Sequence, residues 1–139
     1  MCLILDNNQW GDFLEKKDDI IPIHDWLEKK NGKLIYSNHE KFKELSKKYK
    51  NSLETYRQAG KAKLVLKEEV EEEIKKIRKS QYIMKSNDDH ILGLAKAGNI
   101  KVLCSKDKNL HKDFTTMIPH GKIYQTKNHK HLLVEDLCP

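Results

Sequence analysis

Residues 88–107 read DDHILGLAKAGNIKVLCSKD, a helix-like segment followed by a strand-like one. In the first half, apolar residues recur at helical spacing after a start rich in capping residues, and Gly98-Asn99 is a typical helix end. The apolar run Lys101–Cys104 in the second half has the length of a strand that is covered on both faces. These residues therefore predict a helix that leads into a strand of a parallel sheet.

The rest of the chain repeats this alternation of strands and helices. Further strands are predicted at Met1–Leu5, Lys33–Tyr36, Ala62–Leu66 and Lys122–Tyr124, and further helices near residues 10–14, 21–30, 38–60, 67–79 and 106–114. Asn51-Ser52 would divide the longest of these helices. The alternation indicates an α/β three-layer sandwich around a central, mostly parallel sheet of four or five strands. We place this domain at residues 1–127 and treat the His- and Lys-rich residues 128–139 as a C-terminal tail.

Composition indicates one basic globular domain. The chain has 139 residues, and its 27 Lys and Arg against 21 Asp and Glu give a net charge of +6, which favours polyanionic partners such as nucleic acid. Its three cysteines are widely spaced, which favours a reducing compartment. We see neither a signal peptide nor an apolar stretch of membrane-spanning length, so we expect a cytoplasmic protein without a membrane partner.

Three carboxylates stand where an open α/β sheet binds its ligands. Asp6 directly follows the first apolar run, Asp107 comes three residues after the run that ends at Cys104, and Asp88 opens a predicted helix. The ends of parallel strands and the helices that follow them converge on one edge of such a sheet. Carboxylates gathered there repel one another unless a hard divalent cation neutralises them. This placement favours metal-dependent cleavage of phosphodiester bonds.

Each of these carboxylates also has a purely structural interpretation. Asp88 projects toward the apolar side of its helix, where an unpaired charge is costly, yet it could simply be the N-cap. Asp6 and Asp107 could likewise cap the helices that follow them. Ser105 could donate a hydrogen bond to the site. Asn8 could assist by bonding a carboxylate, although taken alone it is typical of a turn.

Basic residues near the predicted acidic edge could bind a substrate. Lys85, Lys106 and Lys108 could hold phosphates beside a scissile bond, because phosphate contacts position a strand without reading its sequence. Ordinary solvated surface charge is the alternative interpretation. Glu44 lies well away from the apolar stripe of its helix, so periodicity alone describes it as a solvated glutamate.

Four motifs together resemble the PIN-domain family of metal-dependent nucleases. They are LILDNN (3–8), KEL (43–45), DDHILGLA (88–95) and VLCSKDKNL (102–110), and they cover roughly residues 1–115 in order and spacing. The resemblance implies that a set of four acidic residues binds Mg²⁺ or Mn²⁺ with support from Ser105. These four are Asp6, Glu44, Asp88 and Asp107. The chain departs from the family pattern at Asn7, where Ser or Thr is common, and at Asn109, where many members have another Asp.

The resemblance implies an endoribonuclease that cleaves RNA with one or two bound cations. Small nucleases of this kind often serve as the toxin of a toxin–antitoxin pair, which implies an antitoxin partner and a homodimer. The alternative is a catalytically weak RNA-binding or scaffold protein that retains the fold, and Asn109 favours it. A response-regulator-like domain would need a phosphoacceptor Asp after the third strand, where the chain has Leu66-Lys67.

Overall fold

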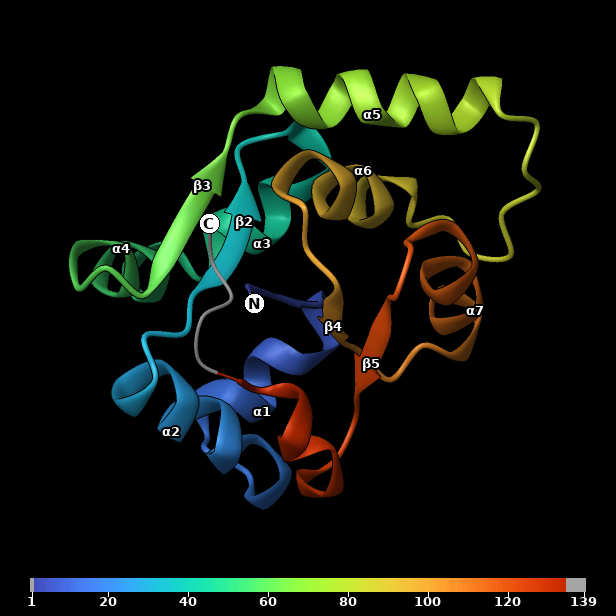
Figure 1. Ribbon diagram of the computed structural model, residues 1–139. Helices are drawn as coiled ribbons and strands as arrows, with labels where there is room; N and C mark the ends of the chain where they lie inside the picture. Colours follow the sequence, from blue (N-terminus) through green and yellow to red (C-terminus); the bar gives the residue numbers. More distant parts are fainter. Residues whose placement is uncertain (1, 135–139) are drawn as a thin grey trace.

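The computed structural model describes residues 2–134 and is built on a parallel five-stranded sheet (Figure 1). The strands are β1 (Leu3–Leu5), β2 (Leu34–Ser37), β3 (Ala62–Val65), β4 (Val102–Cys104) and β5 (Lys122–Tyr124). Their order in the sheet is β3-β2-β1-β4-β5, and every neighbouring pair is parallel. The predicted α/β sandwich is confirmed, with five strands.

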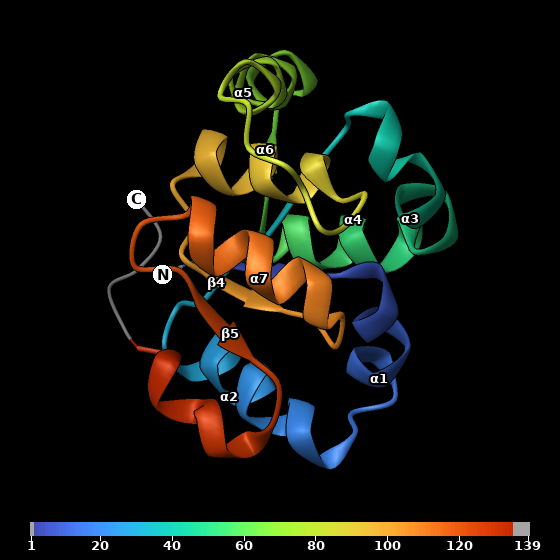
Figure 2. The ribbon, with the colours of Figure 1, turned by 90° about the vertical axis from the view of Figure 1, so that its right-hand side faces the viewer.

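Helices cover both faces of the sheet. They are α1 (Trp10–Leu14), α2 (Ile21–Lys29), α3 (Lys43–Lys48), α4 (Lys50–Gln58), α5 (Lys67–Lys79), α6 (Asp89–Gly98) and α7 (Lys108–Met117), with short 3₁₀ helices η1 (Asn7–Gln9), η2 (Asp18–Ile20), η3 (Glu40–Phe42) and η4 (Lys127–Leu132). Figure 2 shows α6 and α7 on one side of the sheet, with α5 beyond α6, and α2 on the other side. The arrangement is therefore three layers deep.

The central strands are apolar because they have no solvent-facing side. All residues of β1 and β4 are buried, whereas the edge strand β3 exposes Lys63 and Leu64 between two buried residues. Continuous apolar runs are typical of strands covered on both faces. The runs that predicted β1 and β4 therefore mark the middle of the sheet.

The predicted helix over residues 38–60 is divided at a different point from the one expected. The break between α3 and α4 lies at Tyr49, whose φ of −113° and ψ of 24° are not helical, rather than at Asn51-Ser52. The Tyr49 ring stacks on the Trp10 ring at 5.4 Å between centroids. The break therefore coincides with packing of Tyr49 against α1. The spacing of apolar residues in the sequence does not reveal this contact.

Two helices of the outer layer approach each other closely at a glycine. A Cβ atom added at Gly93 in α6 would lie 2.8 Å from Ile74 Cγ1 and 3.0 Å from the carbonyl oxygen of Val70, both in α5. α6 then ends at Asn99, which adopts the left-handed conformation at φ 53°. The end of this helix at Gly98-Asn99 is as predicted.

The first residues of the expected C-terminal tail are part of the packed structure. Trp26 Nε1 in α2 donates a hydrogen bond to the carbonyl oxygen of Val134 at 2.9 Å, and Leu133 is buried. Lys127 Nζ lies 2.9 Å from Asp18 Oδ2. Residues 127–134 therefore pack on α2 and η2, and the last five residues of the tail lie outside the described part of the chain.

Candidate functional site

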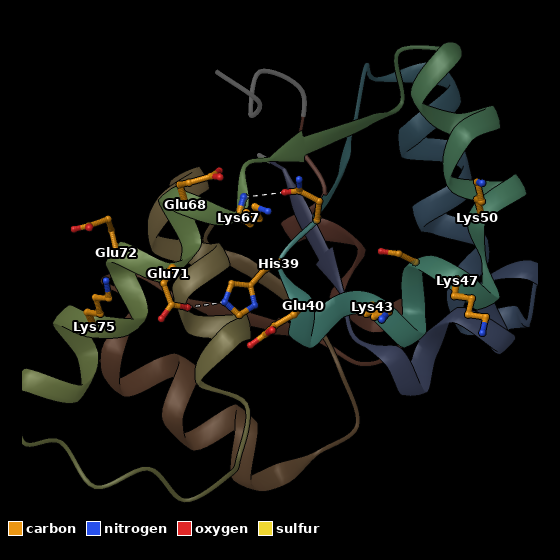
Figure 3. A pocket seen from close by; sticks show the side chains of 12 residues that line it. His39, Glu40, Lys43, Lys47, Lys50, Lys67, Glu68, Glu71, Glu72 and Lys75 are labelled. Atoms are coloured by element: carbon orange, nitrogen blue, oxygen red, sulfur yellow. Dashed lines mark hydrogen bonds and ion pairs between the residues drawn. The ribbon is translucent and has the colours of Figure 1, made fainter.

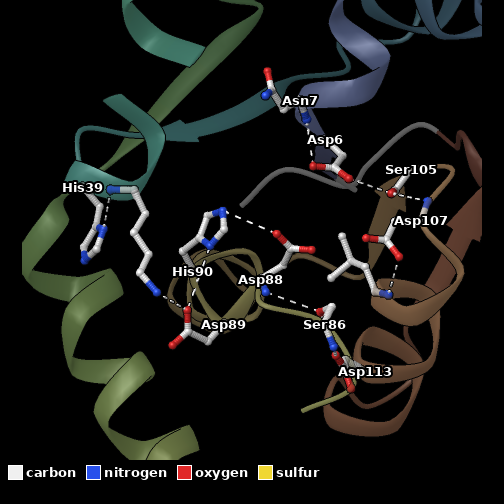
Figure 4. Close-up of polar contacts among 12 residues, drawn as sticks. Asp6, Asn7, His39, Ser86, Asp88, Asp89, His90, Ser105, Asp107 and Asp113 are labelled. Atoms are coloured by element: carbon white, nitrogen blue, oxygen red, sulfur yellow. Dashed lines mark hydrogen bonds and ion pairs between the residues drawn. The ribbon is translucent and has the colours of Figure 1, made fainter. Parts of the chain in front are cut away.

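Asp6, Asp88 and Asp107 come together at the carboxyl edge of the sheet. Asp6 follows β1 and Asp107 follows β4, and these strands are neighbours whose register pairs Leu5 with Cys104. The chain leaves β1 toward β2 on one side and returns at β4 on the other, so this edge is a topological switch point, where open α/β sheets bind ligands. Figure 4 shows Asp6, Asp88 and Asp107 around one space at this edge, with the carboxyl group of Asp107 turned toward the start of α7.

Ser105 bonds the carboxylate of Asp6 and the backbone of Asp107. Its hydroxyl donates to Asp6 Oδ2 at 2.7 Å and accepts from the backbone N–H of Asp107 at 3.1 Å. Its carbonyl oxygen lies 2.6 Å from His111 Nε2, and the serine is fully buried. Asp6 Oδ1 accepts from the backbone N–H of Asn7 at 2.8 Å. Both oxygens of Asp6 are therefore held in place by hydrogen bonds.

Asp107 is the N-cap of α7. Its Oδ1 accepts hydrogen bonds from the backbone N–H groups of Asn109 at 2.9 Å and Leu110 at 3.2 Å. The structural interpretation of this residue is thus confirmed. Its Oδ2 makes no hydrogen bond within residues 2–134, so capping leaves one oxygen available to a ligand.

Asp88 occupies the N-cap position of α6 but does not cap it. Its side chain accepts no hydrogen bond from the first turn, which contradicts the capping interpretation. Burial, with the negative charges of Asp6 and Asp107 next in size, raises the pKa of Asp88 from 3.8 to about 6. Like charges within reach of one another have this effect. The three carboxylates therefore interact as one cluster.

The two residues after Asp88 do not neutralise it. Asp89 pairs with Lys41 at 2.6 Å and with Arg78 at 3.1 Å. His90 Nε2 lies 4.0 Å from Asp88 Oδ1, but burial, with the charge of Lys41, lowers the pKa of this histidine to about 4. His90 is therefore uncharged at neutral pH, and its buried Nδ1 has no hydrogen-bond partner within the described residues.

Asp113 in α7 is a buried carboxylate that is not among the predicted site residues. It is completely shielded from solvent and accepts from the backbone N–H of Lys85 at 2.9 Å, the backbone N–H of Ser86 at 2.8 Å, the Ser86 hydroxyl at 2.8 Å and the Tyr82 hydroxyl at 2.9 Å. Burial raises its pKa, but these hydrogen bonds outweigh burial and hold the pKa below its usual value. It ties α7 to the segment that leads into Asp88.

A sequence signal for Asp113 was present. The residue lies three positions after Leu110 and next to Phe114, on the apolar stripe of its helix, and both of these neighbours are buried. The same reasoning that selected Asp88, a carboxylate on the buried side of a helix, selects Asp113 as well.

The fourth predicted ligand, Glu44, is not part of the cluster. It is exposed in the first turn of α3 and is not among the carboxylates that raise the pKa of Asp88. Asn8 is also exposed, and its Oδ1 accepts from Gln9 Nε2 at 3.1 Å rather than bonding a carboxylate. Asn109 contributes its backbone N–H to Asp107. The metal-binding role of Glu44 stays a prediction.

The three predicted phosphate-binding lysines are exposed around the site. Lys106 Nζ lies 3.1 Å from Asp12 Oδ2, so part of its charge is already paired. Lys108 forms no ion pair in residues 2–134, and the backbone of Lys85 is held by Asp113. Their side chains are available to a polyanion.

A separate groove of about 950 Å³ opens between α5 and the α3–α4 pair (Figure 3). Both walls carry mixed charge: Glu40 and Lys43 lie on the side of α3, and Glu68, Glu72 and Lys75 lie on the side of α5. None of the three clustered aspartates lines it. Its mixed charge and its lack of aromatic side chains other than His39 are unlike a stacking platform for single-stranded nucleic acid. We therefore place the candidate site at the aspartates rather than in this groove.

The donor chemistry of the cluster fits a hard divalent cation, but the side chains are spread apart. Within residues 2–134, no Lys or Arg forms an ion pair with Asp6, Asp88 or Asp107. Oxygen ligands with uncompensated negative charge suit Mg²⁺ or Mn²⁺. In this part of the chain no three His, Cys, Asp or Glu side chains are close enough to hold one ion. The chemistry of these oxygens therefore fits a divalent cation, while their spacing in residues 2–134 does not complete a site for one.

Comparison of the chain with protein-family models, with curated proteins and with solved structures gives no match. Across residues 2–134, no helix combines the length and the hydropathy of a membrane span. The geometry of the site therefore carries the functional argument.

Proposed function

We propose that the chain is a Mg²⁺- or Mn²⁺-dependent endoribonuclease whose PIN-like active site contains Asp6, Asp88 and Asp107. One observation carries the proposal: Asp88 stands at the start of α6 without capping it, and burial together with two neighbouring carboxylates raises its pKa to about 6. A carboxylate perturbed in this way at a topological switch point is typical of functional sites.

The residues of the site have distinct parts in this proposal. Asp6 and Asp107 would be ligands whose orientation is already set, because hydrogen bonds from Ser105 and from backbone N–H groups hold both oxygens of Asp6 and one oxygen of Asp107. Asp88 would be the third ligand, because a pKa of about 6 leaves it mainly ionised at pH 7 and metal ligands must be deprotonated. A divalent cation held there would supply Lewis-acid activation of water and neutralise charge on the phosphate.

RNA as the substrate is supported by charge and by the surroundings of the site. The net charge of +6 attracts polyanions, and the exposed side chains of Lys85 and Lys108 can contact phosphates that flank the scissile bond. Cleavage by carboxylates that hold a cation requires no contact between the protein and a particular base. We therefore propose cleavage of single-stranded or loop RNA.

A catalytically weak RNA-binding or scaffold protein is the second candidate. The spread of the carboxylates in the described residues favours it, as does Asn109, which offers an amide where the family pattern often has a carboxylate. In that case RNA would bind to the basic surface without being cut.

A toxin role, a cognate antitoxin, a homodimer and a cytoplasmic location belong to the same proposal. These four features are supported by the small size of the chain and by analogy with other proteins of similar fold. Such analogy is weaker evidence than the geometry of a site. Co-purification of the chain with the product of a neighbouring reading frame would support the toxin role.

A cleavage assay tests the proposed function. A mixed single-stranded RNA pool is incubated with the parent protein, Asp6→Asn and Asp88→Asn in Mn²⁺, Mg²⁺ or EDTA. We expect cleavage by the parent with either metal, and a loss of at least about 100-fold in both variants, because each removes a charged ligand. Asp89→Asn is the matched control, since Asp89 is already paired with Lys41 and Arg78. Binding of RNA without metal-dependent cleavage would select the second candidate.

A further inference from the structure

The segment between α5 and α6 is held in place by one carboxylate of a different helix. Asp113 accepts hydrogen bonds from two hydroxyls and two backbone N–H groups, of Tyr82, Lys85 and Ser86. The backbone donors lie 27 and 28 positions away in the sequence. The segment therefore has its course set by α7 rather than by its own local structure.

An aspartate is the side chain that suits this place. A buried charge without a Lys or Arg partner is costly, and it is tolerated when hydrogen bonds satisfy it. An ionised carboxylate only accepts hydrogen bonds and has room for about four of them, which matches the four donor groups. Asparagine has nearly the same shape but would turn an NH₂ group toward these donors. The environment is therefore specific for a carboxylate.

Ser86 connects Asp113 to the candidate site. Its hydroxyl donates to Asp113 Oδ2 at 2.8 Å and accepts from the backbone N–H of Asp88 at 3.4 Å. The carbonyl oxygen of Asp88 in turn accepts from the backbone N–H of Ile91 at 3.0 Å. The backbone of Asp88 is thus held on both sides, while its carboxyl group is left without a hydrogen bond from its own helix.

We propose that Asp113 is a positioning residue that presents Asp88 to Asp6 and Asp107. Asp113 itself stays buried beneath the segment and does not touch the metal or the substrate. The inference rests on the proposed function, because the group that Asp113 positions is a ligand of the proposed metal centre. The rigidity of this segment allows Asp88 to remain among like charges instead of turning away into solvent.

Mn²⁺ binding to the metal-free protein tests this role without any cleavage assay. Free Mn²⁺ is measured by electron paramagnetic resonance for the parent, Asp113→Asn, Ser86→Ala and the double variant. We expect each single variant to raise the Mn²⁺ dissociation constant about ten-fold, as other supporting partners of metal ligands do. The double variant should bind about as weakly as Asp113→Asn alone, because the Ser86 hydroxyl acts on Asp88 through its hydrogen bond to Asp113.

A stability control separates positioning from a general loss of structure. Ile23→Val in α2 removes one buried methyl group far from the segment and should leave the Mn²⁺ dissociation constant within about two-fold of the parent. Hydrogen exchange of the Lys85 and Ser86 amides should become faster in Asp113→Asn and stay unchanged in Ile23→Val.

The outcomes distinguish the two proposals. A parent protein that does not bind Mn²⁺ would overturn the proposed function, and the positioning role would fall with it. A parent that binds Mn²⁺ while Asp113→Asn and Ser86→Ala bind it equally well would overturn the positioning role alone. Effects of the two substitutions that multiply in the double variant, or an equal effect of Ile23→Val, would also overturn it. If Asp113→Asn does not fold, Ser86→Ala decides between these results.

Discussion

Asp88 and Asp89 are consecutive in the chain and have opposite electrostatic surroundings. Burial and the charges of Asp6 and Asp107 raise the pKa of Asp88 to about 6. Burial also acts on Asp89, but hydrogen bonds and charges of Lys41 and Arg78 outweigh it and lower the pKa. At neutral pH the charged form of Asp88 is therefore destabilised by its surroundings, and that of Asp89 is stabilised. Asp89 can serve as an internal control for substitutions of Asp88.

We expect Asp88→Asn to stabilise the metal-free protein at pH 7 by about 1–3 kcal/mol, because each pKa unit corresponds to about 1.4 kcal/mol and a side chain that is 27% exposed is partly screened. The sign follows from a folded-state pKa above the unfolded one. Protonation stabilises the fold below about pH 4, and this contribution is lost as the pH rises through 6. Urea unfolding in EDTA at pH 3.5 and pH 7 measures the effect.

The matched variant Asp89→Asn should behave in the opposite way. It removes a partner of Lys41 and Arg78, so we expect a loss of about 1–2 kcal/mol at pH 7. The comparison is made at pH 7, where His90 is uncharged in all these proteins, because loss of the Asp89 charge only lowers the pKa of this histidine further. An Asp88→Asn protein that is less stable than the parent at pH 7 would show that this carboxylate is not electrostatically strained.

Divalent cations should stabilise the parent protein against heat. At a Mn²⁺ concentration of about 100 times the dissociation constant, binding adds about 2.7 kcal/mol, which corresponds to a rise in Tm of roughly 5–10 °C for a chain of this size. Asp88→Asn should lose this rise, and Asp89→Asn should keep it. An equal rise in all three proteins would place the bound ion elsewhere on the surface.

Ser105→Ala tests the serine that links Asp6 and Asp107. The fully buried hydroxyl bonds both residues, and its loss should cost about 1 kcal/mol of stability. Because Asp6 would no longer be held, the Mn²⁺ dissociation constant should rise about ten-fold or more. Thr115→Ala is the control, since this hydroxyl bonds only carbonyl groups of its own helix. If Ser105→Ala lowered the stability and left the Mn²⁺ affinity unchanged, Ser105 would have only a structural role.

The fold could be predicted because its strands are short apolar runs bounded by polar residues. β1 and β4 are entirely buried, so the strand signal and the burial coincide. The break at Tyr49 could not be predicted, because it accompanies the stacking of this ring on Trp10, which is 39 positions away in the chain. Local patterns report local propensity, and tertiary packing decides where a helix is interrupted.

The site was predictable to the extent that it depends on strand ends. Asp6 and Asp107 follow neighbouring parallel strands, so topology alone brings them together. Whether an aspartate at a helix start caps that helix is decided by backbone angles, and here Asp107 caps while Asp88 does not. The four hydrogen-bond donors around Asp113 come from a distant segment, and no sequence pattern indicates them.

Gly93→Ala tests the close packing of α5 and α6. The added Cβ would lie 2.8 Å from Ile74 and 3.0 Å from a carbonyl oxygen of α5, so we expect a loss of about 1–3 kcal/mol in urea unfolding. Gly11→Ala in α1 is the matched control, because nothing lies within 4 Å of its added Cβ and alanine favours a helix by about 0.5–1 kcal/mol. Equal effects of the two substitutions would contradict the packing argument.

Glu44→Gln distinguishes the geometry of the site from the family pattern. The resemblance to PIN-domain nucleases makes Glu44 a metal ligand, whereas its side chain is exposed on α3 and does not contribute to the raised pKa of Asp88. From this geometry we expect Glu44→Gln to change the Mn²⁺ dissociation constant by less than about two-fold, against a loss of about ten-fold or more for Asp88→Asn. Glu40→Gln is the control, because Glu40 is an exposed glutamate of the preceding helix η3. If Glu44→Gln weakened Mn²⁺ binding as much as Asp88→Asn while Glu40→Gln did not, metal binding would have to draw α3 toward the three aspartates.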